Sequence, residues 1–212
     1  MRFRDRRDAG RRLAAELVDL AQERPVVVAL PRGGVPVAAE VAQALGAPLE
    51  IFGVLKVGAP GNRELAVGAI AEDGTGVLDP RSAGRLGMTQ AMLDEALERD
   101  AKELRRRVER YRGGRAPVAV GGRTVIVVDD GLATGLTVLA AVRALRRRDP
   151  ARIVVAVPVG SDESVSMLAE EVDRVVCLMT PEPLLGVGRW YWNFAPVSDD
   201  QVIEALAVAN SA

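Results

Sequence analysis

The sequence predicts one α/β domain with a mainly parallel, twisted sheet that is flanked by helices. Three observations support this fold class. Strand-like and helix-like segments alternate along most of the chain, the strand-like segments are continuous apolar runs, and 212 residues with 49% hydrophobic content suffice for one full core. Continuous apolar strands are typical of parallel sheets that helices cover on both faces. We therefore expect a single domain over residues 1–212.

The first half of the chain is expected to alternate strands with helices. Leu13, Leu17 and Leu20 recur at helical spacing, and Gly46 is a typical helix end. The expected elements are, in order, a helix within 8–22, a strand at 25–31, a helix at 35–46, and strands at 49–57, 65–72 and 76–79, the last two paired.

The second half opens with a long, highly charged helix at 90–111, which forms most of a helical insertion expected at about 88–112. A glycine-rich link over 112–122 follows it. The remaining expected elements are a strand at 124–128, a helix at about 135–148, a strand at 152–158, a helix at 162–171, a strand at 174–179 and a final helix opened by the capping pair Ser198 and Gln201.

Composition excludes several classes of protein. The chain has no histidine, which excludes Ser-His-Asp and Cys-His catalysis and His-ligated metal sites, and its one cysteine, Cys177, leaves no intrachain disulfide. The net charge of −1 gives no sign of a general nucleic-acid binder. No apolar run approaches membrane-spanning length, and the charged N-terminus does not resemble a signal peptide, so we expect a cytoplasmic protein without a membrane partner.

The stretch TVIVVDDGLATGLTV (124–138) carries the clearest functional signal. A buried strand ends on two neighbouring carboxylates, Asp129 and Asp130, at the edge where open parallel sheets bind ligands. Two such groups repel each other unless they face solvent or a polar ligand, and they are good acceptors for the two hydroxyls of a ribose. The following loop enters a helix, so its N–H groups and its threonine hydroxyls can bind a phosphate. Together these features describe a ribose-5-phosphate site.

An ordinary strand–loop–helix connection is the alternative for such a loop. The Walker phosphate pattern does not fit, because Leu136 stands where that pattern requires lysine. The whole string VIVVDDGLATGLT resembles the phosphoribosyl-pyrophosphate (PRPP) motif of type I phosphoribosyltransferases, and the resemblance extends from the first strand to the last. It implies the fold of that family, with a small hood region. The implied PRPP contacts of this motif are Asp129 and Asp130 on the ribose hydroxyls and Ala133, Thr134, Gly135, Leu136 and Thr137 around the 5-phosphate.

A second motif, LPRGGVPVA (30–38), also joins a strand to a helix. Glycines permit close approach of the backbone to a ligand, and arginine binds phosphate oxygens through two N–H groups. The motif resembles the pyrophosphate loop of the family, which implies PRPP contacts by Arg32, Gly33 and Gly34 and a strained cis peptide bond at Arg32–Gly33. A tight turn with a surface arginine is the alternative.

Lys56 is one of two lysines and interrupts the apolar strand FGVLKV (52–57), where we expect a buried setting. An edge lysine whose head reaches solvent is the alternative. The resemblance implies a basic residue near this place that meets the diphosphate of PRPP. The segment 58–64 that follows is expected to be a mobile lid that excludes water.

The segment GVGRWYWNFAPVSDD (186–200) holds both tryptophans of a chain that is poor in aromatic residues. Packing in the core or in a dimer interface is one interpretation. The resemblance implies a hood that stacks on or covers the base, which makes Trp190 and Trp192 candidate base contacts. Positions two apart point to opposite sides of an extended chain, so we expect Trp190 in the pocket and Trp192 beneath the hood or at a subunit contact.

The implied reaction is transfer of the 5-phosphoribosyl group from PRPP to a nitrogenous base with release of pyrophosphate, with Arg32, Lys56 and Asp130 as catalytic residues. Mg²⁺ is the implied cofactor; no side chain is expected to bind it directly, and Asp130 would reach it only through water. Ala133 stands where enzymes for 6-oxopurines usually carry an aspartate, so these bases are not expected as acceptors.

The expected partners are PRPP, a nucleobase-like molecule and a second copy of the chain in a homodimer, without nucleic acid. Two alternatives to a transferase remain open. One is a non-catalytic regulatory homologue that binds PRPP or a nucleotide, and the other is a ribosyl-phosphate hydrolase or phosphorylase on the same scaffold.

Overall fold

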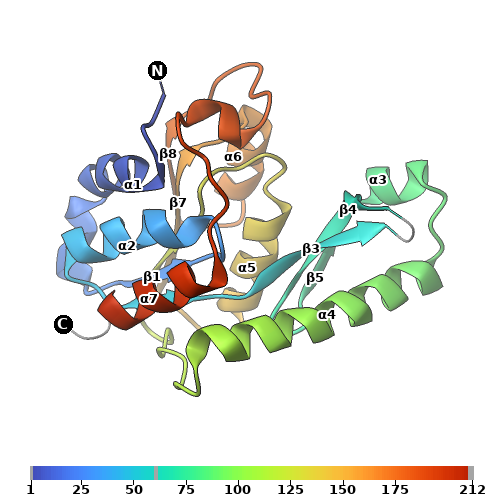
Figure 1. The fold of residues 1–212 in the computed structure, drawn as a ribbon, viewed down its shortest axis with the longest axis horizontal. Coiled ribbons are helices and arrows are strands. Elements are labelled where there is room, and N and C mark those ends of the chain that lie inside the picture. Colours follow the sequence, from blue (N-terminus) through green and yellow to red (C-terminus); the bar gives the residue numbers. More distant parts are fainter. Residues whose placement is uncertain (1, 60–61, 210–212) are drawn as a thin grey trace.

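A computed structural model describes residues 2–59 and 62–209, and for residues 62–65 it describes the backbone alone. The main sheet has five strands in the order β2-β1-β6-β7-β8, and each neighbouring pair is parallel (Figure 1). The strands are β1 (Val26–Ala29), β2 (Leu49–Ile51), β6 (Thr124–Val128), β7 (Arg152–Val159) and β8 (Arg174–Met179). The predicted α/β fold with a mainly parallel sheet is therefore confirmed.

Helices cover both faces of this sheet and create two cores. Along β6, Ile126 and Val128 pack in one core, while Val125 and Val127 pack in the other. This alternation explains why the strand is apolar at every position rather than at every second one. The first core is covered by α1 (Arg6–Ala15), α2 (Gly34–Leu45) and α7 (Asp199–Ala209), and the second by α5 (Leu136–Arg146) and α6 (Asp162–Ala169).

The single helix expected within 8–22 is wrong, because α1 ends at Ala15 and a 3₁₀ helix over Val18–Glu23 follows it. Between them, Leu17 leaves the helical conformation at φ −120° and ψ 1°. Apolar periodicity could not show this break, because the leucines at 13, 17 and 20 are all buried in the same core.

A second sheet lies beside the first and is antiparallel. Its strands are β3 (Val54–Ala59), β4 (Asn62–Ala71) and β5 (Gly76–Leu78) in the order β3-β4-β5, which confirms the predicted pairing of 65–72 with 76–79. The short helix α3 (Pro80–Arg85) follows, and α4 (Gln90–Arg112) then runs along this sheet from the α3 end back toward α7 (Figure 1).

The strand expected at 49–57 is wrong, because the chain changes sheets at Phe52 and Gly53. The Phe52 N–H still donates to Ala29 O of the main sheet (2.9 Å), whereas the Gly53 N–H donates to the Glu72 carboxylate next to β4 (2.8 Å). A Cβ atom at Gly53 would lie 2.3 Å from Val108 Cγ2 of α4. The crossing therefore depends on contacts with distant residues, which an uninterrupted apolar run does not reveal.

The N-terminal segment and the segment that precedes α7 meet in a small hood. The Phe3 N–H donates to Trp190 O, and the Trp192 N–H donates to Phe3 O, each at 2.8 Å. The predicted capping pair then starts α7, because the Ser198 N–H donates to Gln201 Oε1 (2.9 Å) and the Gln201 N–H donates to Ser198 Oγ (3.2 Å). Within the described ranges, no helix combines the length and the apolar character that crossing a membrane requires.

Gly53→Ala tests the crossing between the sheets. The added methyl group would force α4 away from the chain, so we expect a loss of about 1–3 kcal/mol in the free energy of unfolding. Gly84→Ala is the control: this glycine lies exposed in α3 with no atom within 4 Å of an added Cβ, and alanine there should be neutral or stabilising by up to about 1 kcal/mol. Thermal unfolding of both variants measures the difference, and equal stability would contradict the proposed crossing constraint.

Candidate functional site

The two sequence motifs form one site at the carboxyl edge of β1 and β6. A Cβ atom at Gly33 would lie 2.1 Å from Asp130 Oδ2, and one at Gly34 would lie 2.6 Å from Val128 O and 2.9 Å from Asp129 Cα. Any larger residue at either position would displace the acid pair. The structure thus brings together Gly33, Gly34, Asp129 and Asp130, as the sequence predicts.

The cis peptide bond expected at Arg32–Gly33 is wrong by one position, since the cis bond joins Pro31 and Arg32. Gly33 already has helical dihedral angles (φ −60°, ψ −37°) as the residue that precedes α2. The chain therefore changes direction before Gly33, which leaves the two glycines to pack against the acid pair.

The two carboxylates of the acid pair are largely buried and repel each other. The Asp130 N–H donates to Asp129 Oδ1 (2.8 Å). Burial, and then the charge of Asp130, raises the pKa of Asp129 well above its usual 3.8. Burial also raises the pKa of Asp130, although the charges of Arg6 and Lys56 oppose the shift. Such a pair is suited to accept hydrogen bonds from a polar ligand.

The loop after the acid pair leads into α5 and is held by the neighbouring helix. Ala133 O accepts hydrogen bonds from Ser161 Oγ (3.1 Å) and Ser164 Oγ (3.0 Å) at the start of α6. Gly135 has φ +71° and precedes α5 without a side-chain cap, so the first-turn N–H groups at Leu136 and Thr137 are available to an anion. Thr134 is exposed beside them.

Arg32 lies at the edge of this site, half-exposed, and its Nη1 is 3.6 Å from Asp199 Oδ1 at the start of α7. Asp199 is also bound by Tyr111 Oη (2.7 Å) and by Arg110 Nη1 (3.0 Å). Arg32 directly precedes Gly33, which packs against Asp130, and its guanidinium is held by a weak ion pair that a stronger anion can displace.

The buried setting expected for Lys56 is wrong, because its side chain is exposed. Side chains along β3 alternate between the two faces of its sheet, and Lys56 is exposed while the next residue, Val57, is buried. The positive charge of Lys56 opposes the rise in the pKa of both aspartates, which places it within electrostatic reach of the acid pair. Of the expected lid at 58–64, Gly58 and Ala59 end β3 and Asn62 begins β4, while residues 60–61 lie outside the described residues.

The hood holds the two tryptophans in different environments. Trp190 ends a short 3₁₀ helix (Val187–Trp190), is partly buried and donates from Nε1 to Leu184 O (2.9 Å). Trp192 is 73% exposed and lies under the guanidinium of Arg2, 5.0 Å from its carbon. The prediction that Trp192 packs beneath the hood is therefore wrong. Tyr191 instead fills the buried position of this segment, between Phe3 and Phe194.

Sequence reasoning missed Arg6 and Tyr191. The Arg6 Nε atom donates to Asp130 Oδ2 (2.8 Å), and the Tyr191 hydroxyl donates to Asp130 O (2.7 Å). Burial, and then the charge of Asp130, raises the pKa of Tyr191, so its hydroxyl remains a donor. Four arginines occur among the first seven residues, so nothing singled out Arg6, and the neighbouring tryptophans drew attention away from Tyr191.

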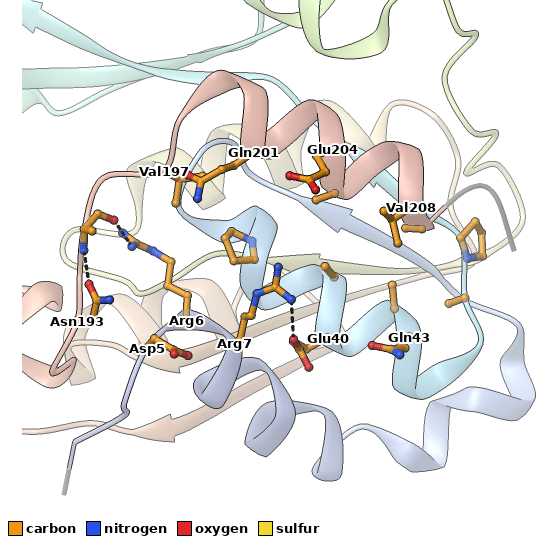
Figure 2. A pocket seen from close by; sticks show the side chains of 18 of the residues that line it. Asp5, Arg6, Arg7, Glu40, Gln43, Asn193, Val197, Gln201, Glu204 and Val208 are labelled. Atoms are coloured by element: carbon orange, nitrogen blue, oxygen red, sulfur yellow. Dashed lines mark hydrogen bonds and ion pairs between the residues drawn. The ribbon is translucent and has the colours of Figure 1, made fainter.

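A large cavity of the described chain lies elsewhere. It measures about 1050 Å³ and opens between α1, α2 and α7, where Arg7 and Glu40 face each other (Figure 2). Arg6, which contacts Asp130, is among its lining residues, whereas Arg32, Gly33, Gly34 and the acid pair are not. Among residues 2–59 and 62–209, no group of three His, Cys, Asp or Glu side chains is arranged to hold a metal ion.

Asp129→Asn tests whether the raised pKa of Asp129 destabilises the folded chain at neutral pH. Because the folded chain binds this proton more tightly than the unfolded chain, the free energy of unfolding should fall as pH rises from 3.8 toward the raised pKa of the folded state. Asparagine keeps the oxygen that accepts from the Asp130 N–H but cannot ionise. We expect the variant to be more stable than the wild type at pH 7, by a difference that vanishes below about pH 4. Thermal unfolding across this range measures it, and a less stable variant at pH 7 would contradict the expectation.

Comparisons with known proteins identify the family of the chain. The model of the phosphoribosyl transferase domain matches residues 4–198, which include both motif loops and the hood. Over 96% of its length the chain is 46% identical to a Mycobacterium tuberculosis (strain ATCC 25618 / H37Rv) protein named "Putative phosphoribosyl transferase Rv0571c", and the match covers 46% of that protein. The chain thus spans about half the length of the curated relatives it matches.

Solved structures show the same fold. TT1426 from Thermus thermophilus is 47% identical, with a TM-score of 0.80 over 97% of this chain and 98% of that one. The AQ2163 protein from Aquifex aeolicus shares the fold at 15% identity, with a TM-score of 0.51 over 82% of this chain and 73% of that one. The resemblance first seen in two short motifs thus holds over nearly the whole sequence, and the chain belongs to the phosphoribosyl transferase domain family.

Proposed function

We propose that this chain transfers the 5-phosphoribosyl group of PRPP to a nitrogen atom of an aromatic base and releases pyrophosphate. The observation that carries the proposal is the contact of Gly33 and Gly34 with the acid pair. It brings a loop suited to a diphosphate and a loop suited to a ribose phosphate to one edge of the sheet.

The donor would bind along the β6–α5 loop. Asp129 and Asp130 accept hydrogen bonds from the two ribose hydroxyls, and the segment Ala133–Thr137 surrounds the 5-phosphate at the start of α5. The Ser161 and Ser164 hydroxyls fix the carbonyl of Ala133, so the phosphate loop is set in place before the ligand arrives.

The leaving diphosphate would lie on the Arg32-Gly33-Gly34 loop. The glycine backbone gives access, and Arg32 exchanges its weak contact with Asp199 for the oxygens of the diphosphate. Lys56, on the β3 strand, adds a second positive charge. Both cations act on negative charge that grows as the bond from ribose to diphosphate breaks, so they stabilise the transition state more than the bound donor.

The acidic, oxygen-rich donor set near the diphosphate loop suits Mg²⁺, which prefers oxygen ligands and retains several waters. When bound, the ion would neutralise the diphosphate. We propose that Asp130 holds one of its waters, and that no side chain binds it directly. Positioning of the donor and neutralisation of the leaving diphosphate then supply the catalysis, so the proposed transfer requires no histidine.

The base would meet the hood. Trp190 is the better candidate, because it is partly buried and its ring is anchored to Leu184 O, whereas Trp192 is largely exposed. We propose that Trp190 contributes stacking to the acceptor site, and that Trp192 contributes less.

Release of pyrophosphate from Mg-PRPP, measured with a panel of nitrogenous bases, tests the proposed function. Pyrophosphate that appears only when a base is added supports transfer. Release without any base points to a hydrolase, and tight binding of PRPP without release points to a regulatory PRPP-binding protein.

The double variant Asp129→Asn, Asp130→Asn tests the ribose site. Charge-assisted hydrogen bonds contribute about 1.5–3 kcal/mol each, so the affinity for Mg-PRPP should fall at least about tenfold. Calorimetric titration measures the affinity, and the affinity for pyrophosphate alone serves as the control and should change little. Unchanged PRPP binding by the folded double variant would remove the acid pair from the donor site.

The acceptor should not be a 6-oxopurine. Ala133 has no group that could exchange a proton with the N7 atom of such a base, and the site in the described chain offers no other carboxylate on this loop beyond the acid pair. We expect little or no pyrophosphate release with hypoxanthine or guanine. Efficient turnover of either base in the same assay would show that another residue serves N7.

A further inference from the structure

Arg6 makes three directed contacts at the proposed ribose site. Its Nε donates to Asp130 Oδ2 (2.8 Å), its Nη1 donates to Ala195 O in the hood (2.8 Å), and its guanidinium carbon lies 3.8 Å from the ring centre of Phe194. The side chains of Arg6 and Asp130 are only 10% and 15% exposed. This arrangement differs from a surface ion pair, in which two mobile side chains meet in water.

The position of Arg6 is fixed by the start of α1. Asp5 caps this helix by accepting from the Asp8 N–H (2.8 Å), and Arg6 is its first residue. One turn later Gly10 packs so closely on α2 that a Cβ atom there would lie 2.6 Å from Val37 O. The guanidinium therefore approaches Asp130 from a rigid element, not from a loose terminus.

The contact with Arg6 also determines which carboxylate oxygen of Asp130 is available to a ligand. Asp130 Oδ2 is held between Arg6 and the Cα of Gly33, which leaves the other carboxylate oxygen and the Asp129 carboxylate to meet a ligand. Arg6 provides a positive charge next to two buried like charges, so it offsets their repulsion and fixes the orientation of one of them.

We propose that Arg6 is the positioning residue of the acid pair and that it links the C-terminal hood to ribose binding. The inference rests on the proposed function, because it assigns the acid pair to the ribose hydroxyls. The geometry requires arginine: one guanidinium donates to two acceptors in different directions and stacks on an aromatic ring, whereas a lysine ammonium could satisfy only part of this set.

The test compares Arg6→Gln and Arg6→Lys with the control Arg7→Gln. Arg7 is the next residue of the same helix, is 74% exposed and contacts Glu40 only at 3.7 Å. Two ligands separate the halves of the site: ribose 5-phosphate carries the diol and the 5-phosphate, and pyrophosphate carries neither. Calorimetry gives their affinities, and steady-state kinetics gives KM for PRPP and kcat.

For Arg6→Gln we expect ribose 5-phosphate affinity to fall and KM for PRPP to rise, each by at least about tenfold, with a smaller change in kcat and in pyrophosphate affinity. Arg6→Lys should recover part of the loss, and Arg7→Gln should match the wild type. Wild-type affinity for ribose 5-phosphate in a folded Arg6→Gln variant would overturn the inference. If Arg6→Gln does not fold, Arg6→Lys decides in the same way: weakened ribose 5-phosphate binding supports the inference and wild-type binding overturns it.

Failure of the proposed function looks different, because it would be seen in the wild type. A wild-type chain that binds ribose 5-phosphate but never releases pyrophosphate refutes the transferase and leaves the Arg6 comparison valid. A wild-type chain that binds no ribose 5-phosphate refutes both.

Discussion

The close approach of two backbones at the ends of β1 and β6 is the constraint on which the rest of the site depends. The two strands are hydrogen-bonded neighbours in parallel register, with Ala29 opposite Val128, so the turns that follow them leave the sheet at the same level. Because Gly33 and Gly34 carry no side chain, these turns touch. Two loops that are nearly a hundred residues apart in sequence, Arg32-Gly33-Gly34 and the β6–α5 loop, thereby form one surface, and neither can shift without the other.

The acid pair is the electrostatically unfavourable part of this arrangement; two cations offset its charge, and a tyrosine holds the backbone beneath it. Arg6 reaches it from α1, Lys56 acts on it from β3, and Tyr191 donates to the Asp130 carbonyl from the hood. The sequence motif around Asp129 and Asp130 is therefore local in sequence, but the residues that stabilise it lie near the beginning, in the middle and near the end of the chain. Replacement of the motif residues alone would not transfer the site to another scaffold.

The features that could be predicted from the sequence are those that depend on neighbouring residues. The apolar runs of the strands, the acid pair, the glycine loop and the Ser198–Gln201 cap each lie within a few consecutive residues, and patterning is sufficient to recognise them. The change of sheets at Gly53 depends on Glu72 and on α4. These are relations between segments far apart in sequence, which no window of the sequence contains. Arg6 was hidden for the same reason, since its partner lies 124 residues away.

The two arginines of the site are held by ion pairs of different kinds, and this difference has a consequence for ionic strength. Arg32 is half-exposed and 3.6 Å from Asp199, whereas Arg6 and Asp130 are nearly shielded from water and 2.8 Å apart. Dissolved ions screen exposed charges over about 8 Å at physiological salt and about 3 Å at 1 M, and they act much less on shielded pairs. Added salt therefore loosens Arg32 and leaves Arg6 and the acid pair in place, so the two halves of one small site respond differently to the same solution.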